Sequence, residues 1–388
     1  MKELDRADFS TARRVVIKVG TSLLRGADHA VDRGFLKNIA AQIAETRSLP
    51  DRRQIILVSS GAVGFGMMRL GLSRRPADVA TLQAAAAVGQ PELMKAWADA
   101  FAPHSVRVSQ ILLTNDGLQD RARFVNAKHA IRRILDLNVV PVVNENDTVA
   151  VDELTFGDND TLSALVAAMV DADLLINLTN VDGFFAPSDG GGRTLLKTVP
   201  VIRPEWITAT QAGERSERGR RGGFTLGGMS AKLKAARLAL RAGIPVVIAN
   251  GREKKILAAV LSGRPAGTLF LPQERGLKGK KVWLSLFRAP AGTIVVDRGA
   301  AAAVGRNGKS LLASGILRAT GQFSRQDCVS IVSEDGREIA RGISAYSSGE
   351  IQTIAGCPST DIRRRLGIAP ADAAPAEVIH RDNMALLP

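Results

Sequence analysis

The sequence predicts an α/β fold, a three-layer αβα sandwich with a mostly parallel sheet, followed by a small, mainly β domain. Three observations predict this. Short apolar runs rich in Val and Ile alternate with longer helical patterns as far as residue 251. Near residue 270 the pattern changes to short strands and turns. The chain has 388 residues and 45% hydrophobic content, which is enough for two or three domains.

The elements of the first domain follow in order along the chain. Six apolar runs are predicted buried strands: residues 13–20, 53–61, 108–114, 138–147, 172–180 and 242–251. Five stretches between or after them are predicted helices: Arg33–Thr46, Ala77–Phe101, Asp120–Asp136, Thr161–Asp171 and Ser230–Ala242. Ser188–Arg193 and Gly213–Gly223 are predicted mobile loops. Ligands of such sheets bind beyond the carboxyl ends of the strands, so the candidate site lies there.

The second domain begins after a linker, Gln273–Lys280. We predict a first domain over residues 12–272, a β domain over 281–366 and a C-terminal tail over 367–388. Asp335-Gly336 between two alternating runs predicts a β-hairpin. The tail is rich in Ala and Pro, and we expect it to be loosely ordered.

Composition excludes several classes of protein. Cys328 and Cys357 are too few for a disulfide framework, and the four His form no cluster at metal-ligand spacing. No signal peptide and no run that could span a bilayer is present, so we expect a cytoplasmic protein. The net charge of +14 divides as +9 over residues 1–270 and +5 over 271–388. Because the excess is spread out, it is compatible with nucleic-acid binding and equally with attraction of small anions.

The first strand ends in Lys18-Val-Gly-Thr-Ser22. A lysine in an apolar strand is costly to bury without an anionic partner, and alternation places Lys18 and Gly20 on the same side. Gly20 would let backbone N–H groups approach an anion, while Thr21 and Ser22 add hydroxyl donors. This turn is a candidate phosphate cradle, although a strand end with a solvated lysine explains it equally well.

The second strand leads into Ser59-Ser60 and three glycines, Gly61, Gly64 and Gly66. Their spacing is G-x-x-G-x-G, whereas the dinucleotide fingerprint is G-x-G-x-x-G, so a Rossmann interpretation is weakened. The chain has no Walker sequence G-x-x-x-x-G-K-[ST] either. A tight turn into a helix remains an alternative interpretation of these glycines.

Two acidic-amide clusters follow the apolar part of the predicted fourth strand, Val139–Val143. Asn144-Glu-Asn-Asp147 comes directly after it, where a turn is the simpler interpretation and binding of a zwitterion the functional one. Gly157-Asp-Asn-Asp160 comes ten residues later, ahead of an apolar helix. Asp160 or Thr161 is the expected N-cap. Capping accounts for one residue and leaves Asp158, Asn159 and Asp160 together to be explained.

The segment Gly227-Gly-Met-Ser-Ala-Lys232 precedes the last predicted helix of this domain. Glycines before a helix expose N–H groups and the positive end of its dipole, and Ser230 is an expected cap. Lys232 in the first turn opposes the dipole, which makes more sense if a polyphosphate lies between them. Lysines, glycine turns and acidic clusters at strand ends together favour phosphoryl transfer, with Asp160 either holding the lysines or helping to organise Mg²⁺.

These motifs also carry a family resemblance. VVIKVGTSLL, VSSGAVGFG, AAVGQPELM, NVVPVVNENDTVA, FGDNDTLSALVA, GGMSAKLKAA and AGIPVVIANG, in this order, closely resemble bacterial glutamate 5-kinases. APAGTIVVDRGAAAAV, SLLASGI and GQFSRQDCVSIV resemble the PUA domain that many of them carry. The resemblance extends from about residue 12 to the end. It implies an amino acid kinase-like first domain and a PUA-like second domain.

The resemblance implies ATP-dependent, Mg²⁺-assisted phosphorylation of L-glutamate to L-glutamyl 5-phosphate, the first step of proline synthesis. It also implies a homo-oligomer (dimer or tetramer) and feedback inhibition by L-proline, and it leaves open whether the product is handed over to a glutamyl phosphate reductase. By the same resemblance Lys18, Lys232 and Asp160 are catalytic, and Ser60, Asp147 and Asn159 bind glutamate. The nucleotide-binding residues are Thr179, Asn180, Leu226, Gly227, Gly228, Met229, Ser230, Ala231 and Lys232; no metal ligand is predicted.

Two departures and two alternatives remain. Asn180 stands where the family usually has Asp and Leu226 where Thr is common, which puts details of nucleotide binding in doubt. Another amino acid kinase, acting on acetylglutamate, aspartate or UMP, is the alternative within the enzyme class. An RNA-binding protein is the alternative outside it, disfavoured because residues 281–366 have few aromatic side chains.

We expect the β domain to be structural or regulatory. Arg215–Arg221 is expected to be a solvated loop, with a lid over ATP as the alternative.

Overall fold

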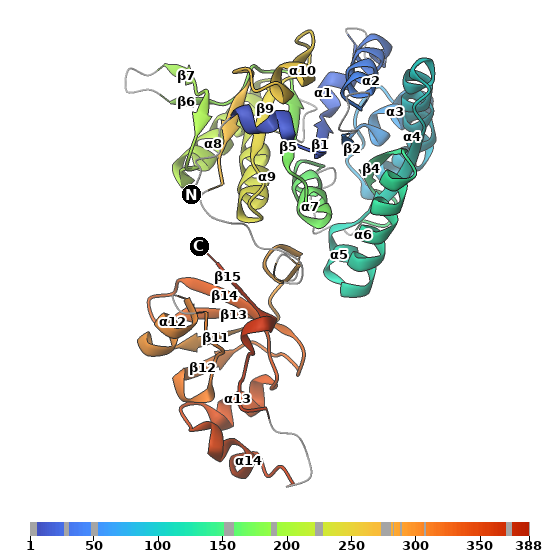
Figure 1. Cartoon of the computed structure of the whole chain (residues 1–388). Coiled ribbons are helices and arrows are strands. Elements are labelled where there is room, and N and C mark those ends of the chain that lie inside the picture. Colours follow the sequence, from blue (N-terminus) through green and yellow to red (C-terminus); the bar gives the residue numbers. More distant parts are fainter. Residues whose placement is uncertain are drawn as a thin grey trace. The chain divides into compact units, whose positions relative to one another are not determined.

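Figure 1 shows a computed structural model of the chain. It describes residues 6–26, 31–47, 53–150, 159–187, 192–221, 228–272, 281, 283–287, 289–305, 308–369 and 375–387. The chain divides into two compact units: unit 1 is Met1–Leu118 with Ala122–Gly276, and unit 2 is Gln119–Arg121 with Leu277–Pro388. The exact domain boundaries at residues 272, 281 and 366 stay predictions.

Unit 1 is built on an eight-stranded sheet with the order β3-β4-β2-β1-β5-β9-β10-β8. Neighbouring strands run parallel except β9 and β10. The six strands predicted from apolar runs are confirmed as β1–β5 and β9, and the mostly parallel α/β class is confirmed with them. The strands are β1 Arg14–Val19, β2 Gln54–Ser59, β3 Val108–Leu113, β4 Val140–Glu145, β5 Leu174–Thr179, β8 Thr198–Val199, β9 Val246–Asn250 and β10 Thr268–Phe270.

Helices cover both faces of this sheet (Figure 1). One face packs on α2 Arg33–Arg47, α4 Val79–Phe101 and α10 Ile256–Leu261 through a continuous apolar core. On the other face α7 Asn159–Val170 contacts β1 and β5, and α9 Met229–Arg241 contacts α7 and β9. The remaining helices of this part are α1 Thr21–Leu24, α3 Ala62–Arg69, α5 Asn115–Gln119, α6 Arg121–Asp136 and α8 Pro204–Arg221. The five predicted helices are confirmed as α2, α4, α6, α7 and α9.

Helices α3 and α4 cross at very short range, and this explains one of the glycines. A Cβ atom on Gly66 would lie 1.7 Å from the Ala85 carbonyl oxygen, and one on Gly89 would lie 1.8 Å from the Ala62 carbonyl oxygen. No real side chain tolerates such contacts, so both positions require glycine for backbone approach. The last glycine of the G-x-x-G-x-G pattern therefore serves helix packing.

Two loop predictions in unit 1 need correction. The predicted mobile loop Gly213–Gly223 is wrong as far as residue 221, because α8 continues to Arg221; residues 222–223 lie outside the described residues. Glu and Arg are good helix formers, and each Gly costs only about 1 kcal/mol in a helix. The predicted loop Ser188–Arg193 is wrong only at Arg193, since β7 Arg193–Leu195 pairs with β6 Phe185–Pro187. Residues 188–191 lie outside the described residues, so the rest of this loop stays a prediction.

Unit 2 contains a five-stranded sheet with the order β12-β11-β13-β14-β15. The predicted hairpin is confirmed: β13 Cys328–Ser333 and β14 Glu338–Ile343 are antiparallel around Gly336. The prediction of a loosely ordered tail is wrong for residues 375–387, because β15 Met384–Leu386 adds to β14 and Ile379 is fully buried. The apolar residues of the tail complete a core that the strands alone would leave open. The other elements are β11 Gly292–Val296, β12 Ile316–Thr320, α12 Arg298–Gly305, α13 Ser348–Ile354 and α14 Ile362–Arg365.

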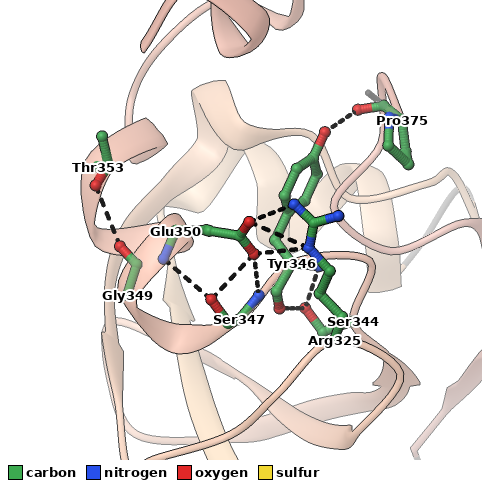
Figure 2. A network of polar contacts seen from close by, with 8 residues as sticks. All are labelled: Arg325, Ser344, Tyr346, Ser347, Gly349, Glu350, Thr353 and Pro375. Carbon is green, nitrogen blue, oxygen red and sulfur yellow. Dashed lines mark hydrogen bonds and ion pairs between the residues drawn. The ribbon is translucent and has the colours of Figure 1, made fainter. Parts of the chain in front are cut away.

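Helix α13 begins with a complete capping box. The Ser347 hydroxyl accepts from the Glu350 amide, and the Glu350 carboxylate accepts from the Ser347 amide (Figure 2). Arg325 pairs with the same carboxylate and lies over the Tyr346 ring.

In the part of the chain that the structure describes, no helix has the length and apolarity needed to cross a membrane.

Candidate active site

The polar side chains of unit 1 gather at the carboxyl ends of the central parallel strands. Lys18 is the fifth residue of β1, and Ser60 directly follows β2. The Ser60 amide donates to the Val19 carbonyl, at 3.2 Å, so the ends of β1 and β2 lie side by side. Asn144 lies in β4, and Thr179 ends β5. This is the edge where parallel sheets bind their ligands.

Two lysines far apart in the sequence meet at one carboxylate. Lys18 Nζ lies 2.7 Å from Asp160 Oδ1, and Lys232 Nζ lies 3.2 Å from Asp160 Oδ2. The side chains are 3%, 5% and 1% exposed for Lys18, Lys232 and Asp160 respectively. Strand β1, the first turn of α7 and the first turn of α9 supply one group each. The convergence of Lys18 and Lys232 that phosphoryl transfer would need is therefore present.

The environment of Asp160 keeps it ionised. Burial raises the pKa of this carboxyl, but the charges of Lys18 and Lys232 and the hydrogen bonds from Lys18 and Asn177 outweigh burial. The net result is a pKa well below the usual range for aspartate. Of the two roles considered for Asp160, the contacts match the one in which it holds the lysines.

Two predicted helix caps are wrong. Helix α7 begins at Asn159, so Asp160 and Thr161 lie inside its first turn, and the Asp160 carboxylate contacts the two lysines. Helix α9 has Gly228 at its N-cap with no side-chain cap, and the Ser230 hydroxyl donates to Glu214. In both cases a tertiary contact takes the polar side chain that local capping would have used.

Asp147 lies two residues beyond β4 and is buried. Burial raises the pKa of its carboxyl to about 6, against the opposing charge of Arg75. A buried carboxylate of this kind is stabilised by an added cation, such as a substrate ammonium group. Asn159, at the start of α7, is also buried, and its Oδ1 has no hydrogen-bond partner among the described residues.

A chain of amides links α4 to β4. Asn144 Nδ2 donates to Gln90 Oε1 at 2.8 Å, and Gln90 Nε2 donates to Gln110 Oε1 at 3.2 Å. Asn144 Oδ1 is buried without a partner within the described part of the chain, as is Asn177 Oδ1. Unsatisfied buried acceptors are rare in folded proteins and indicate a place for an external donor. Gln90 was not among the predicted site residues, because only the fold brings α4 against β4.

The predicted nucleotide-binding residues lie in two places. Thr179 is buried at the end of β5, and its hydroxyl lies 3.4 Å from Oδ1 of the exposed Asn180. Gly228, Met229, Ser230, Ala231 and Lys232 form the N-cap and first turn of α9. Leu226 and Gly227 lie outside the described residues.

Glu214 of α8 occupies the start of α9. Its Oε1 accepts from the Ser230 amide at 3.0 Å, and its Oε2 accepts from the Ser230 hydroxyl at 2.6 Å. A carboxylate is stabilised at this position by the helix dipole. The contact joins residues 16 positions apart, on two helices, so no local sequence pattern predicted it.

A Mg²⁺ ion, which the resemblance implies, would be held chiefly by the phosphates of ATP. Within the described ranges no group of three His, Cys, Asp or Glu could hold a metal by itself. Both oxygens of Asp160 accept from other side chains. Mg²⁺ in phosphoryl-transfer sites keeps several waters and takes much of its coordination from the substrate phosphates, which requires no protein cage.

Comparison with known proteins identifies the family of each domain. The model of the amino acid kinase family matches residues 13–250, and that of the PUA domain matches residues 292–366. A relative from Geobacter sp. (strain M21) named glutamate 5-kinase is 44% identical, over 97% of this chain and 98% of its own length. Another of that name from Moorella thermoacetica is 44% identical over 98% of each chain.

The chain therefore belongs to the amino acid kinase family and, within it, to the glutamate 5-kinases, with a PUA domain in the C-terminal part. Among solved structures, carbamate kinase from Giardia lamblia bound to AMP-PNP has a TM-score of 0.48 and 17% identity, covering 68% of this chain and 100% of that one.

Proposed function

We propose that this chain transfers the γ-phosphoryl group of ATP to the side-chain carboxylate of L-glutamate, giving L-glutamyl 5-phosphate for proline biosynthesis. The family supports the reaction class. The convergence of Lys18 and Lys232 on Asp160 is the single observation that supports it most. Two buried ammonium groups on one carboxylate suit a site that stabilises a transferred phosphoryl group.

The reaction needs alignment and positive charge, and it needs no general base. The glutamate side-chain carboxylate is already ionised at neutral pH, so it attacks the γ-phosphorus directly. An oxygen–phosphorus bond forms to the carboxylate while the bond to the β-phosphate oxygen breaks, and ADP leaves. Lys18 and Lys232 turn from Asp160 towards the phosphoryl oxygens, whose negative charge they stabilise. Mg²⁺ bound to ATP supplies further charge stabilisation on the phosphates.

Gly20 keeps room for the phosphoryl group. A Cβ atom at this position would lie 3.5 Å from Lys18 Nζ, in the space that a phosphate oxygen would enter. The glycine is in an extended conformation that any residue adopts, so its role is spatial.

Asp147, Asn159 and Ser60 are the proposed glutamate-binding residues. The ionised Asp147 carboxylate would accept from the substrate ammonium group, and the unpartnered Asn159 Oδ1 offers a second acceptor. The Ser60 hydroxyl would donate to the α-carboxylate. Holding the substrate in this way converts a bimolecular encounter into an aligned attack.

The test is an acceptor panel with ATP, Mg²⁺ and hydroxylamine, which traps acyl phosphates as hydroxamates. We expect hydroxamate with L-glutamate and little with N-acetylglutamate or aspartate. Hydroxamate with either of those and none with L-glutamate would overturn the proposal. A reaction without ATP is the control.

The resemblance alone supports three further proposals: inhibition by L-proline, assembly into dimers or tetramers, and handover to a glutamyl phosphate reductase. We also propose a cytoplasmic location, as the sequence led us to expect. Proline added to the same assay tests the first, and light scattering of the purified protein tests the second.

The lid hypothesis for Arg215–Arg221 falls on side chains outside those described. Replacement of Arg215, Arg218, Arg220 and Arg221 by Ala with no change in the ATP KM would reject it.

A further inference from the structure

Asn177 is a polar residue in the middle of an otherwise apolar strand. Strand β5 reads Leu-Leu-Ile-Asn-Leu-Thr, and every one of its residues is buried. Asn177 is the register partner of Lys18 on the neighbouring parallel strand β1. Partners in register point to the same face, so both side chains face α7, which contacts both strands.

The carboxamide of Asn177 makes one hydrogen bond to the residues that the structure describes, and that bond is to Asp160. Its Nδ2 donates to Asp160 Oδ1 at 2.7 Å, the same oxygen that Lys18 approaches at 2.7 Å. Its own Oδ1 is buried and has no partner among the described residues. An apolar side chain would avoid the free-energy cost of this unsatisfied acceptor, so packing alone does not explain the amide.

We propose that Asn177 is a positioning residue for phosphoryl transfer, which fixes the Asp160 carboxylate when Lys18 and Lys232 turn towards the phosphates of ATP. This inference rests on the proposed function. The lysines are cations, so the phosphates of ATP compete with Asp160 for them. The Asn177 amide is a neutral donor, so a phosphate draws it away from Asp160 only weakly. Asn177 therefore remains on Asp160 Oδ1 throughout the cycle, and Asp160 keeps its place and its charge.

The role follows from what Asp160 must do. A buried carboxylate that loses both cationic partners would be driven to protonate or to shift. Either change would misplace the lysines, both during phosphoryl transfer and at the start of the next turnover. One permanent neutral donor from a rigid central strand prevents both, since β5 is hydrogen-bonded to β1 and β9 on its two sides.

The test compares Asn177→Leu with Leu175→Val as a matched packing control. Leu keeps the branching of Asn at Cγ, is larger, and removes the donor; Leu175 lies two residues earlier in β5 and is fully buried. We expect Asn177→Leu to lower kcat roughly 10- to 100-fold, the range typical of residues that orient a catalytic group, with both KM values within about threefold of wild type. We expect Leu175→Val to keep its kcat within about twofold.

A pH profile separates positioning from a structural role. In Asn177→Asp a second carboxyl faces Asp160 of α7, Lys18 of β1 and Lys232 of α9, and two carboxyls so close share a proton. Only the protonated carboxyl at position 177 can donate to Asp160 as the amide does. The ratio of Asn177→Asp activity to wild-type activity should therefore rise as pH falls from about 8 to about 6, as more of the variant takes up the shared proton. Saturating glutamate is used throughout, so that binding does not limit the rate.

Wild-type activity with L-glutamate is measured first. Its absence would refute the proposed function, on which the role of Asn177 rests, whereas the outcomes below refute the role of Asn177 alone. An active wild type with a folded Asn177→Leu variant of unchanged kcat would overturn the inference. So would an equal loss in Leu175→Val, or an activity ratio for Asn177→Asp that is flat with pH. Circular dichroism and thermal unfolding establish that each variant is folded.

Discussion

Each unit of the molecule contains an acid–base network, and the two differ in burial and in partner count. In unit 1 the Asp160 carboxylate, 1% exposed, takes two ammonium groups and an amide. In unit 2 the Glu350 carboxylate, 25% exposed, takes one guanidinium, from Arg325, together with the groups of the capping box (Figure 2). Both carboxyls have a pKa below the usual range, so a lowered pKa by itself does not distinguish them.

The burial of the charged groups distinguishes the two networks. In unit 1, removing three charges from water costs several kcal/mol per ion, and their mutual attraction offsets only part of this cost. A network at the helix start and partly in solvent costs little and stabilises little. The buried network is therefore poorly explained by stability and well explained by chemistry, whereas the exposed one is explained by the cap and the ion pair alone.

The largest expected effect comes from removing one ammonium group. Lys232→Met keeps the apolar stem and deletes the charge, so we expect kcat to fall by about 100- to 1,000-fold, as when one transition-state donor is lost. Initial rates of hydroxamate formation at saturating substrates measure it. Arg325→Met, which deletes a charge from the network of unit 2, is the matched control and should leave kcat within twofold. A Lys232→Met variant with more than a tenth of wild-type kcat would contradict the assignment.

The next effect concerns Asp147, whose pKa burial raises to about 6. The ionised form accepts the substrate ammonium group, so kcat/KM for L-glutamate should fall as pH drops below about 6, approaching tenfold per unit. The substrate side-chain carboxyl titrates near pH 4.3 and does not interfere there. Asp147→Asn should raise the glutamate KM roughly 10- to 100-fold, which corresponds to the loss of a hydrogen bond to a charged group. It should also abolish the fall in kcat/KM at acid pH. An unchanged acid limb in Asp147→Asn would show that another group titrates.

A smaller effect is expected from Glu214, which binds the start of α9. Glu214→Ala removes both hydrogen bonds to Ser230 and the favourable charge at the helix N-terminus. We expect the free energy of unfolding to fall by about 1 kcal/mol, the usual worth of a cap. Urea unfolding followed by circular dichroism measures the change, with Glu214→Gln as the control that keeps an acceptor and should lose less. Equal midpoints for Ala and wild type would show that the cap contributes nothing.

Much of the fold and site could be predicted from sequence because the signals are local. Apolar runs and helical periodicity gave the central strands and helices, and a lysine in an apolar strand indicated Lys18. Asn177 carries the same signal, a polar residue in an apolar strand, and was missed because an amide is a less conspicuous cost than a charge. Glu214 and β15 could not be predicted, because each depends on a partner distant in the chain. Helix α8 was missed because its glycines and arginines suggested a loop, although packing against α9 stabilises a helix there.

The smallest effect separates the charge of Glu350 from its capping role. Glu350→Gln keeps a side chain that the capping box accepts and removes the ion pair with Arg325. We expect about 0.2 to 1 kcal/mol less stability at pH 7 and no change in kcat. Since the hydrogen bond from Arg325 is the largest cause and lowers the pKa of Glu350 to about 2, this stability is present above the unfolded value of 4.5. It is lost as pH falls through 2, so the wild-type and Gln unfolding curves should converge over that range. A difference that persists well below pH 2 would mean that Glu350 acts through shape or hydrogen bonding, and the contrast with the buried carboxylate of unit 1 would then be weaker than its charges suggest.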